Sequence, residues 1–176
     1  MQALKLARDL GLEAESAGIW SFFGGWAAKA ECFNELALAL SDARDASCVE
    51  LFKEVAEEWT RRGDHHKASL AMIECARSAF KLPATNRSSF LQLVSSQLQR
   101  CLSLCRASKI DNAKAIEAEC LYLLALSTEM QGMNRTAAPL FKEASVLYAA
   151  LEDAHGQARA LLHFGTRYLS SFNDKV

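Results

Sequence analysis

The chain of 176 residues is long enough for a single domain, 1–176, that buries a sizeable core without disulfides or metals. Its 20 basic and 21 acidic residues give a formal net charge of -1, so it lacks the basic field that attracts nucleic acid or an anionic membrane, and we predict neither as a partner. Only 8 Gly and 2 Pro accompany a hydrophobic content of 51%, which favours helix over sheet.

Residues 1–10 form a charged, amphipathic pattern rather than a secretory signal, and no apolar run approaches the roughly 20 residues that cross a bilayer. We therefore predict a cytoplasmic protein, with a nuclear location as the alternative. The six cysteines all lie in helical patterns, so we expect them to be reduced and buried like other small hydrophobic residues.

Apolar residues recur at steps of three and four along most of the chain, which predicts an all-α fold of about seven to eight helices. The expected helices cover residues 2–9, 26–40, 48–62, 65–81, 89–106, 112–131, 135–151 and 154–172. Because the links are short, we expect neighbouring helices to pack as antiparallel hairpins. These hairpins cover approximately 2–40, 48–81, 89–131 and 135–172.

Several residues carry the signals that begin and end helices. Gly63 suits the position just past a helix end, and Asp64 suits the cap of the next helix. Pro83 should stop the helix before it, because proline lacks an amide hydrogen, and the polar stretch 84–88 is then expected to be a link. Asp111 is expected to cap the helix that follows it.

Two apolar segments stand out among the predicted helices. The segment 120–126 contains seven consecutive apolar or aromatic residues, so we expect it to be buried on nearly all sides at the centre of the core. The last helix presents an apolar stripe, which consists of Ala158, Leu161, Leu162, Gly165, Tyr168, Leu169 and Phe172.

The sequence LFKE occurs twice, starting at Leu51 and at Leu140, and the residues after it correspond as well. The matching pairs are Trp59 and Tyr148, Asp64 and Asp153, and His66 and His155. Repetition of a helix, a turn and a helix is typical of stacked helical hairpins, so we expect the chain to be a helical repeat.

The spacing of small and aromatic residues in both copies resembles the tetratricopeptide repeat and, in its longer helices, the soluble NSF attachment proteins. The first copy shows the pattern at Ala56, Trp59, Gly63, Asp64 and Ala68, and the second at Ser145, Tyr148, Ala158 and Gly165. Phe80 and Ser170 stand where the repeat has a proline. The resemblance implies an α-solenoid, a right-handed stack with one concave face.

An aromatic cluster surrounds Gly24 and Gly25. Its members are Trp20, Phe22, Phe23 and Trp26. These side chains can close the open end of the stack, or they can anchor a partner protein, because tryptophan-rich clusters dominate the energetics of interfaces. We take them as the candidate partner-binding residues. A second candidate is the acidic run Glu54, Glu57 and Glu58, which is either a solvated helix face or a docking patch, and which Arg61 and Arg62 can partly neutralise.

Cysteine and histidine residues raise the question of metal binding or catalysis. Cys101 and Cys105 lie one helical turn apart and could bind zinc together with His65 or His66, but they also lie on an apolar stripe. No cysteine occupies a helix start or a glycine turn that would activate it, and no phosphate-binding loop is present. We predict no catalytic residue, no metal and no cofactor.

Together these features predict a non-enzymatic protein–protein interaction module. It would act as a scaffold or adaptor subunit of a larger cytosolic assembly and bind helices or extended peptides of other proteins. One alternative is an adaptor in vesicle fusion, as the resemblance to the attachment proteins implies. A second alternative is a thiol- or zinc-dependent enzyme built on a helical bundle.

Overall fold

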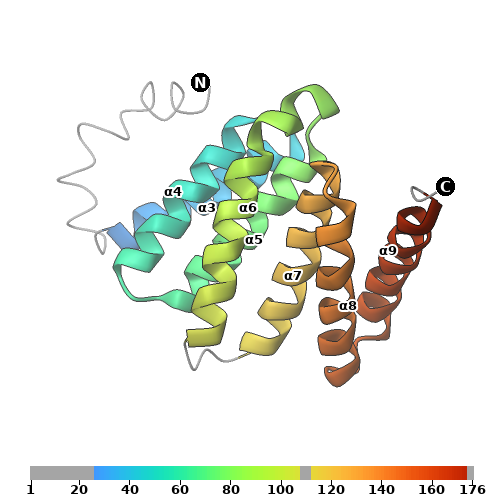
Figure 1. Ribbon diagram of the computed structural model, residues 1–176. Helices are drawn as coiled ribbons and strands as arrows, with labels where there is room; N and C mark the ends of the chain where they lie inside the picture. The colour runs from blue at the N-terminus through green and yellow to red at the C-terminus, as the bar shows by residue number, and fades with distance from the viewer. Residues whose placement is uncertain (1–25, 108–111, 174–176) are drawn as a thin grey trace. The chain divides into compact units, whose positions relative to one another are not determined.

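The computed structural model describes residues 26–107 and 112–173 (Figure 1). Within these ranges the chain is all-helical and has no strand, which confirms the predicted all-α class. The helices are α3 (Trp26–Asp42), α4 (Ser47–Arg61), α5 (His65–Lys81), α6 (Ala84–Ala107), α7 (Ala113–Met130), α8 (Asn134–Ala150) and α9 (Ala154–Asn173). None of them combines the length and the apolar character needed to cross a membrane. The chain divides into two compact units, Met1–Asn86 and Arg87–Val176.

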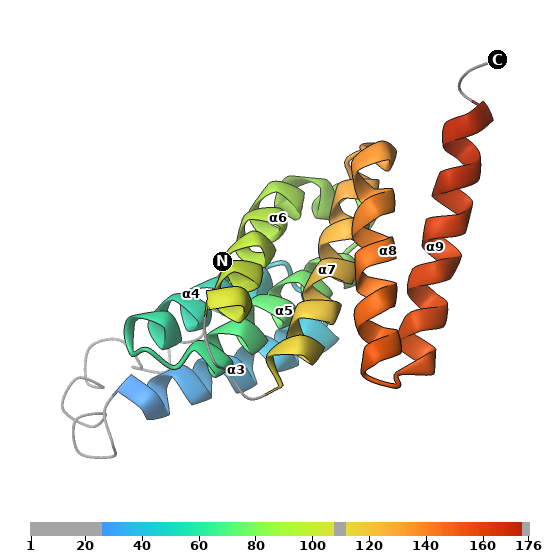
Figure 2. The same ribbon diagram turned by 60° about the horizontal axis from the view of Figure 1, so that its bottom comes forward.

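In the first unit, α3, α4 and α5 pack against one another, side by side in Figures 1 and 2. The apolar residues of α4 are buried, with Phe52 and Ala56 fully enclosed. The small residues of α5 let the helices come close, so that the Cys75 thiol donates to the Val49 carbonyl oxygen at 3.4 Å. A buried hydrogen bond of 2.8 Å from the Ser78 hydroxyl to the Ser41 hydroxyl joins α5 to α3.

The turn between α4 and α5 follows its predicted chemistry. Gly63 has a φ of +76°, a left-handed conformation that glycine adopts without a steric penalty. A carboxylate oxygen of Asp64 accepts a hydrogen bond of 3.0 Å from the backbone N–H of Lys67, which caps the first turn of α5. Both sequence signals for this turn are confirmed.

The start of α6 differs from the prediction. The helix begins at Ala84, directly after Pro83, rather than at Ser89, so the stretch 84–88 is not a link. Leu82 is extended, with a ψ of 153°, and the Pro83 carbonyl oxygen accepts from the Asn86 N–H at 3.0 Å. The proline ends one helix and at once opens the next, because its fixed φ suits a first helical turn. The polar residues form the exposed beginning of α6.

In the second unit, α7 is the central helix. Residues 120–125 are all buried and Leu126 is half-buried, which confirms the prediction for this segment. The Cys120 thiol donates to the Leu98 carbonyl oxygen of α6 at 3.0 Å. The hydroxyl groups of Ser95 and Ser127 lie 2.9 Å apart across the same pair of helices. On its other side α7 packs against α8, whose Phe141 is fully buried.

The turn between α8 and α9 corresponds to the turn between α4 and α5. Glu152 takes the left-handed conformation there, with a φ of +58°, and Asp153 accepts from the Gly156 N–H at 2.9 Å. Pro139 lies in the second turn of α8. Asp111, the predicted cap of α7, lies outside the described residues.

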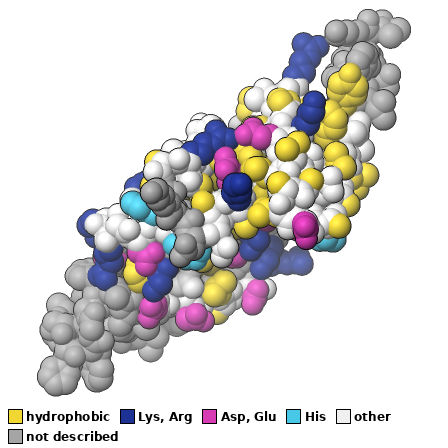
Figure 3. All heavy atoms as spheres, turned by 90° about the horizontal axis from the view of Figure 1, so that it is seen from below, with side chains coloured by type: hydrophobic (Ala, Val, Ile, Leu, Met, Phe, Trp, Pro, Cys, Tyr) yellow, Lys and Arg dark blue, Asp and Glu magenta, His cyan; other side chains and the backbone are white. Residues whose placement is uncertain are grey.

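The last helix, α9, packs on α8 with the face that carries Gly156 and Ala160. The described members of the apolar stripe noted in the sequence lie on the opposite side, and they are Ala158, Leu161, Leu162, Gly165 and Tyr168. Leu161, Leu162 and Tyr168 are 46%, 68% and 50% exposed. In Figure 3, hydrophobic side chains gather over the part of the view that holds α8 and α9.

Candidate functional site

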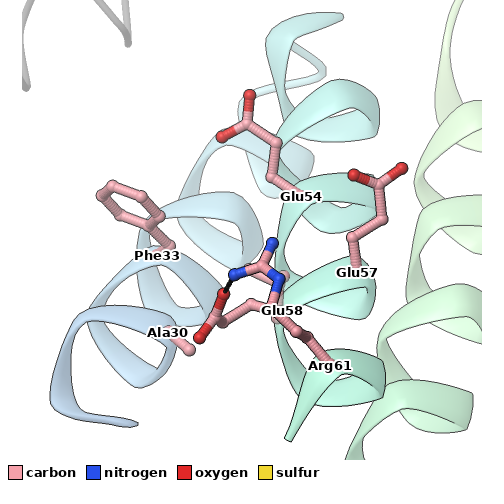
Figure 4. Close-up of a pocket in the computed structure, with 7 residues that line it drawn as sticks. Ala30, Phe33, Glu54, Glu57, Glu58 and Arg61 are labelled. Atoms are coloured by element: carbon pink, nitrogen blue, oxygen red, sulfur yellow. Dashed lines mark hydrogen bonds and ion pairs between the residues drawn. The ribbon is translucent and has the colours of Figure 1, made fainter. Parts of the chain in front are cut away.

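A pocket of about 240 Å³ opens between α3 and α4 in the first unit (Figure 4). It is lined by Ala30, Phe33, Glu54, Val55, Glu57, Glu58 and Arg61. Ala30 and Val55 are 4% and 2% exposed and form an apolar floor. Phe33 reaches the opening from α3, while the charged side chains reach it from α4 (Figure 4).

The charges at this pocket largely balance. Both Arg61 and Arg62 donate to the carboxylate of Glu58, the second through Nε at 2.7 Å. This confirms the prediction that the two arginines partly neutralise the acidic run at helical spacing. Glu58 therefore lies between two guanidinium groups at the rim.

The size of the pocket limits what it can hold. Pockets for small molecules usually measure roughly 300–1,000 Å³, so this one is smaller than an ordinary ligand site. Its volume is enough for a single large apolar side chain.

A second depression, of about 410 Å³, involves α3, α4 and α5. It is lined by Glu31, Asn34, Leu38, Trp59, Lys67, Leu70, Ala71 and Glu74. Lys67 Nζ lies 4.2 Å from the centre of a Trp59 ring and 3.1 Å from Glu31 Oε1, so its ammonium is held between an aromatic face and a carboxylate. Leu70 is 44% exposed beside this group and offers an apolar contact.

The predicted partner-binding residues cannot be placed beside these depressions. Trp20, Phe22 and Phe23 lie outside the described residues, and Trp26 begins α3 with a side chain that also lies outside them. Leu70 is not among the residues predicted from the sequence. A signal for it exists, because Leu70 interrupts the otherwise polar exposed face of α5, and an apolar residue on such a face often marks a contact.

The described cysteines, which the sequence suggested for metal binding or catalysis, are buried in the structure. Cys101 and Cys105 are buried on α6. Within residues 26–107 and 112–173, no cluster of three or more His, Cys, Asp or Glu side chains could hold a metal ion. The described thiols of Cys48, Cys75 and Cys120 are buried as well.

We expect Cys75 to be inert toward alkylation in the native protein. Burial raises its pKa to about 12, so about one thiol in 10,000 is ionised at pH 8, and the thiolate is the reactive form. Iodoacetamide at pH 8 should label Cys75 at least about 100-fold faster once guanidinium unfolds the chain, as mass spectrometry can follow. Equal rates in native and unfolded protein would contradict the buried placement.

The same pKa has a consequence for stability. An unfolded thiol titrates near 9.0, so the buried thiol favours the folded state fully below that pH. This contribution is lost as the pH rises from about 9 through about 12.

Comparison of the chain with family models and with curated proteins finds no match.

Proposed function

We propose that this protein is a non-enzymatic protein–protein interaction module, a scaffold or adaptor subunit whose helices stack as hairpins in the manner of tetratricopeptide repeats. Support comes from the equivalence of its two copies. The turns of α4–α5 and α8–α9 place a left-handed residue, Gly63 or Glu152, at the same position. The next residue, Asp64 or Asp153, accepts from the backbone N–H three residues later in both. Recurrence of a unit at this level of detail is typical of helical-repeat scaffolds.

The observation that carries the proposal is the pair of depressions beside α3. Each has an apolar part, Val55 in one and Leu70 in the other, next to charged side chains. A helix or extended peptide that inserts large apolar residues at regular spacing uses such depressions as side-chain pockets.

A peptide-display selection on the purified protein tests this function. We expect selected peptides to share large apolar residues at helical spacing, with a Kd on the order of micromolar. Fluorescence anisotropy should show Leu70→Glu weakening their binding at least about tenfold, because the carboxylate would need to be desolvated in the contact.

Val146→Glu is the matched control for this test. Val146 is 61% exposed on α8, so the same added charge at a site outside the depressions should leave peptide affinity unchanged. Equal losses in both variants, or no peptide above background, would contradict the proposed site.

A further inference from the structure

The outward face of α9 contains a compact set of four residues at helical spacing, which we call the socket. Ala158, Leu161, Leu162 and Gly165 occupy positions i, i+3, i+4 and i+7, which lie together on one side of a helix and form the four corners of the socket. Leu161 and Leu162 are the two central residues of this set, and they are 46% and 68% exposed. A Cβ added at Gly165 would meet nothing within 4 Å, so the small corner opens to the outside.

The corresponding socket in the first copy is closed. Asp64 and Asp153 both cap their helices, which aligns α5 with α9 and places the same four corners on α5. These corners are Ser69, Met72, Ile73 and Ala76, which are 0%, 0%, 4% and 1% exposed. On both helices the residues at the four corners are small, large, large and small in chain order. One copy of the socket is therefore buried and the other lies open.

The open socket is also symmetric about its own centre. Read in either direction, the corners run small, Leu, Leu, small, so an antiparallel copy of α9 presents the same pattern. None of the corners is an acidic or basic residue, and neither is Tyr168 beyond them on the same stripe. Two such faces can meet without like charges opposing each other, which an isologous contact requires of both partners at once.

We propose that this face, Ala158, Leu161, Leu162, Gly165 and Tyr168, pairs with the same face of a second copy of the chain around a two-fold axis between Leu161 and Leu162. In that arrangement Leu161 lies opposite the partner's Leu162, and Ala158 lies opposite the partner's Gly165. Tyr168 lies opposite the partner's His155, whose imidazole can form a hydrogen bond with the phenol. The symmetry and the absence of charge are properties that self-pairing needs and that a different helical partner would not require.

The exposed area sets the expected strength of the dimer. The three large side chains expose roughly 350 Å² of surface per copy, within the range of the largest apolar patch on a typical monomer, which is often functional. With flanking residues, the pair would bury about 1,000 Å² in total, at the low end for specific interfaces. We therefore expect a Kd on the order of 10–100 µM rather than an obligate dimer.

Sedimentation equilibrium of the full chain over a roughly hundredfold concentration range around this Kd tests the proposal. The wild type should shift from monomer to dimer. Leu162→Glu should remain monomeric, because it places two carboxylates at the two-fold axis. Val146→Glu, an equal change at a residue that is 61% exposed on α8, should dimerise as the wild type does.

Gly165→Leu provides a second variant that does not depend on added charge. The leucine side chain would crowd the partner's Ala158, so dimerisation should weaken at least about tenfold. Circular dichroism should show unchanged helicity, because the monomer has open space at this position. A wild type that stays monomeric at every concentration would overturn the proposal. So would a dimer that both Leu162→Glu and Gly165→Leu leave intact.

Different substitutions test the dimer and the proposed peptide site, so either proposal can fail while the other holds. Leu70→Glu lies in the first unit and should leave the sedimentation of the chain unchanged. Leu162→Glu should leave peptide affinity unchanged in turn. Loss of dimerisation in Leu70→Glu would place the contact elsewhere and overturn the assignment to α9.

Discussion

Phe141→Ala is expected to lower the free energy of unfolding by about 4 kcal/mol, the largest loss that we predict for a single substitution. Phe141 is fully buried on α8. Its ring stacks on His163 of α9, with centres 4.9 Å apart, and meets the edge of Tyr122 of α7 at 5.8 Å. The loss combines the transfer energy of the ring with the cavity left among three helices.

Urea denaturation followed by circular dichroism measures this change. Val146→Ala, on the same helix, should alter stability by no more than about 0.5 kcal/mol, because Val146 is 61% exposed. Phe141→Leu should cost about 1–1.5 kcal/mol, since it keeps most of the apolar volume. A loss below about 1 kcal/mol for Phe141→Ala would mean that the ring does not join the three helices.

Gly156→Ala is expected to destabilise the protein by about 2–3 kcal/mol, against the general preference of helices for alanine. A Cβ at this position would lie 2.5 Å from a ring carbon of Tyr148 and 2.6 Å from a carboxylate oxygen of Asp153. The ring has little room to move, because Tyr148 is 4% exposed and its hydroxyl donates to Glu119 at 2.6 Å. Burial also raises the pKa of Tyr148, so the hydroxyl keeps its proton for this bond.

Gly165→Ala is the matched control, since it makes the same change on the same helix. A Cβ there meets nothing within 4 Å, so the helix preference for alanine should prevail and stabilise the monomer by about 0.5–1 kcal/mol. Thermal unfolding at a concentration well below the expected dimer Kd reports both effects. Shifts of the same sign in the two variants would contradict the close contact at Gly156.

The turn between α4 and α5 could be predicted from the sequence, because its conformation depends on residues close together in the chain. Gly63 and Asp64 are adjacent, and the conformation of one and the cap formed by the other depend on residues within one helical turn. The start of α6 was not predictable in the same way. Polar residues after Pro83 suit both a link and an exposed first turn, so their composition does not separate the two.

Features that depend on how two helices pack together could not be predicted from the sequence pattern. Periodicity placed Leu161 and Leu162 on one face of α9, but it does not say whether another helix covers that face. The depressions beside α3 bring together Glu31 and Lys67, or Ala30 and Val55, which lie far apart in sequence. Their shape depends on how closely the helices approach, and the sequence alone does not fix that distance.

The order of helix packing also bears on how the chain folds during its synthesis. α3 packs with α4, α4 with α5, α7 with α8 and α8 with α9, so most partners in space are neighbours along the chain. Short loops close such contacts at a small entropic cost, and proteins of low contact order fold in microseconds to milliseconds. A ribosome adds roughly 5–20 residues each second. Each pair of neighbouring helices can therefore pack soon after it leaves the exit tunnel, and the order of translation becomes the order of assembly.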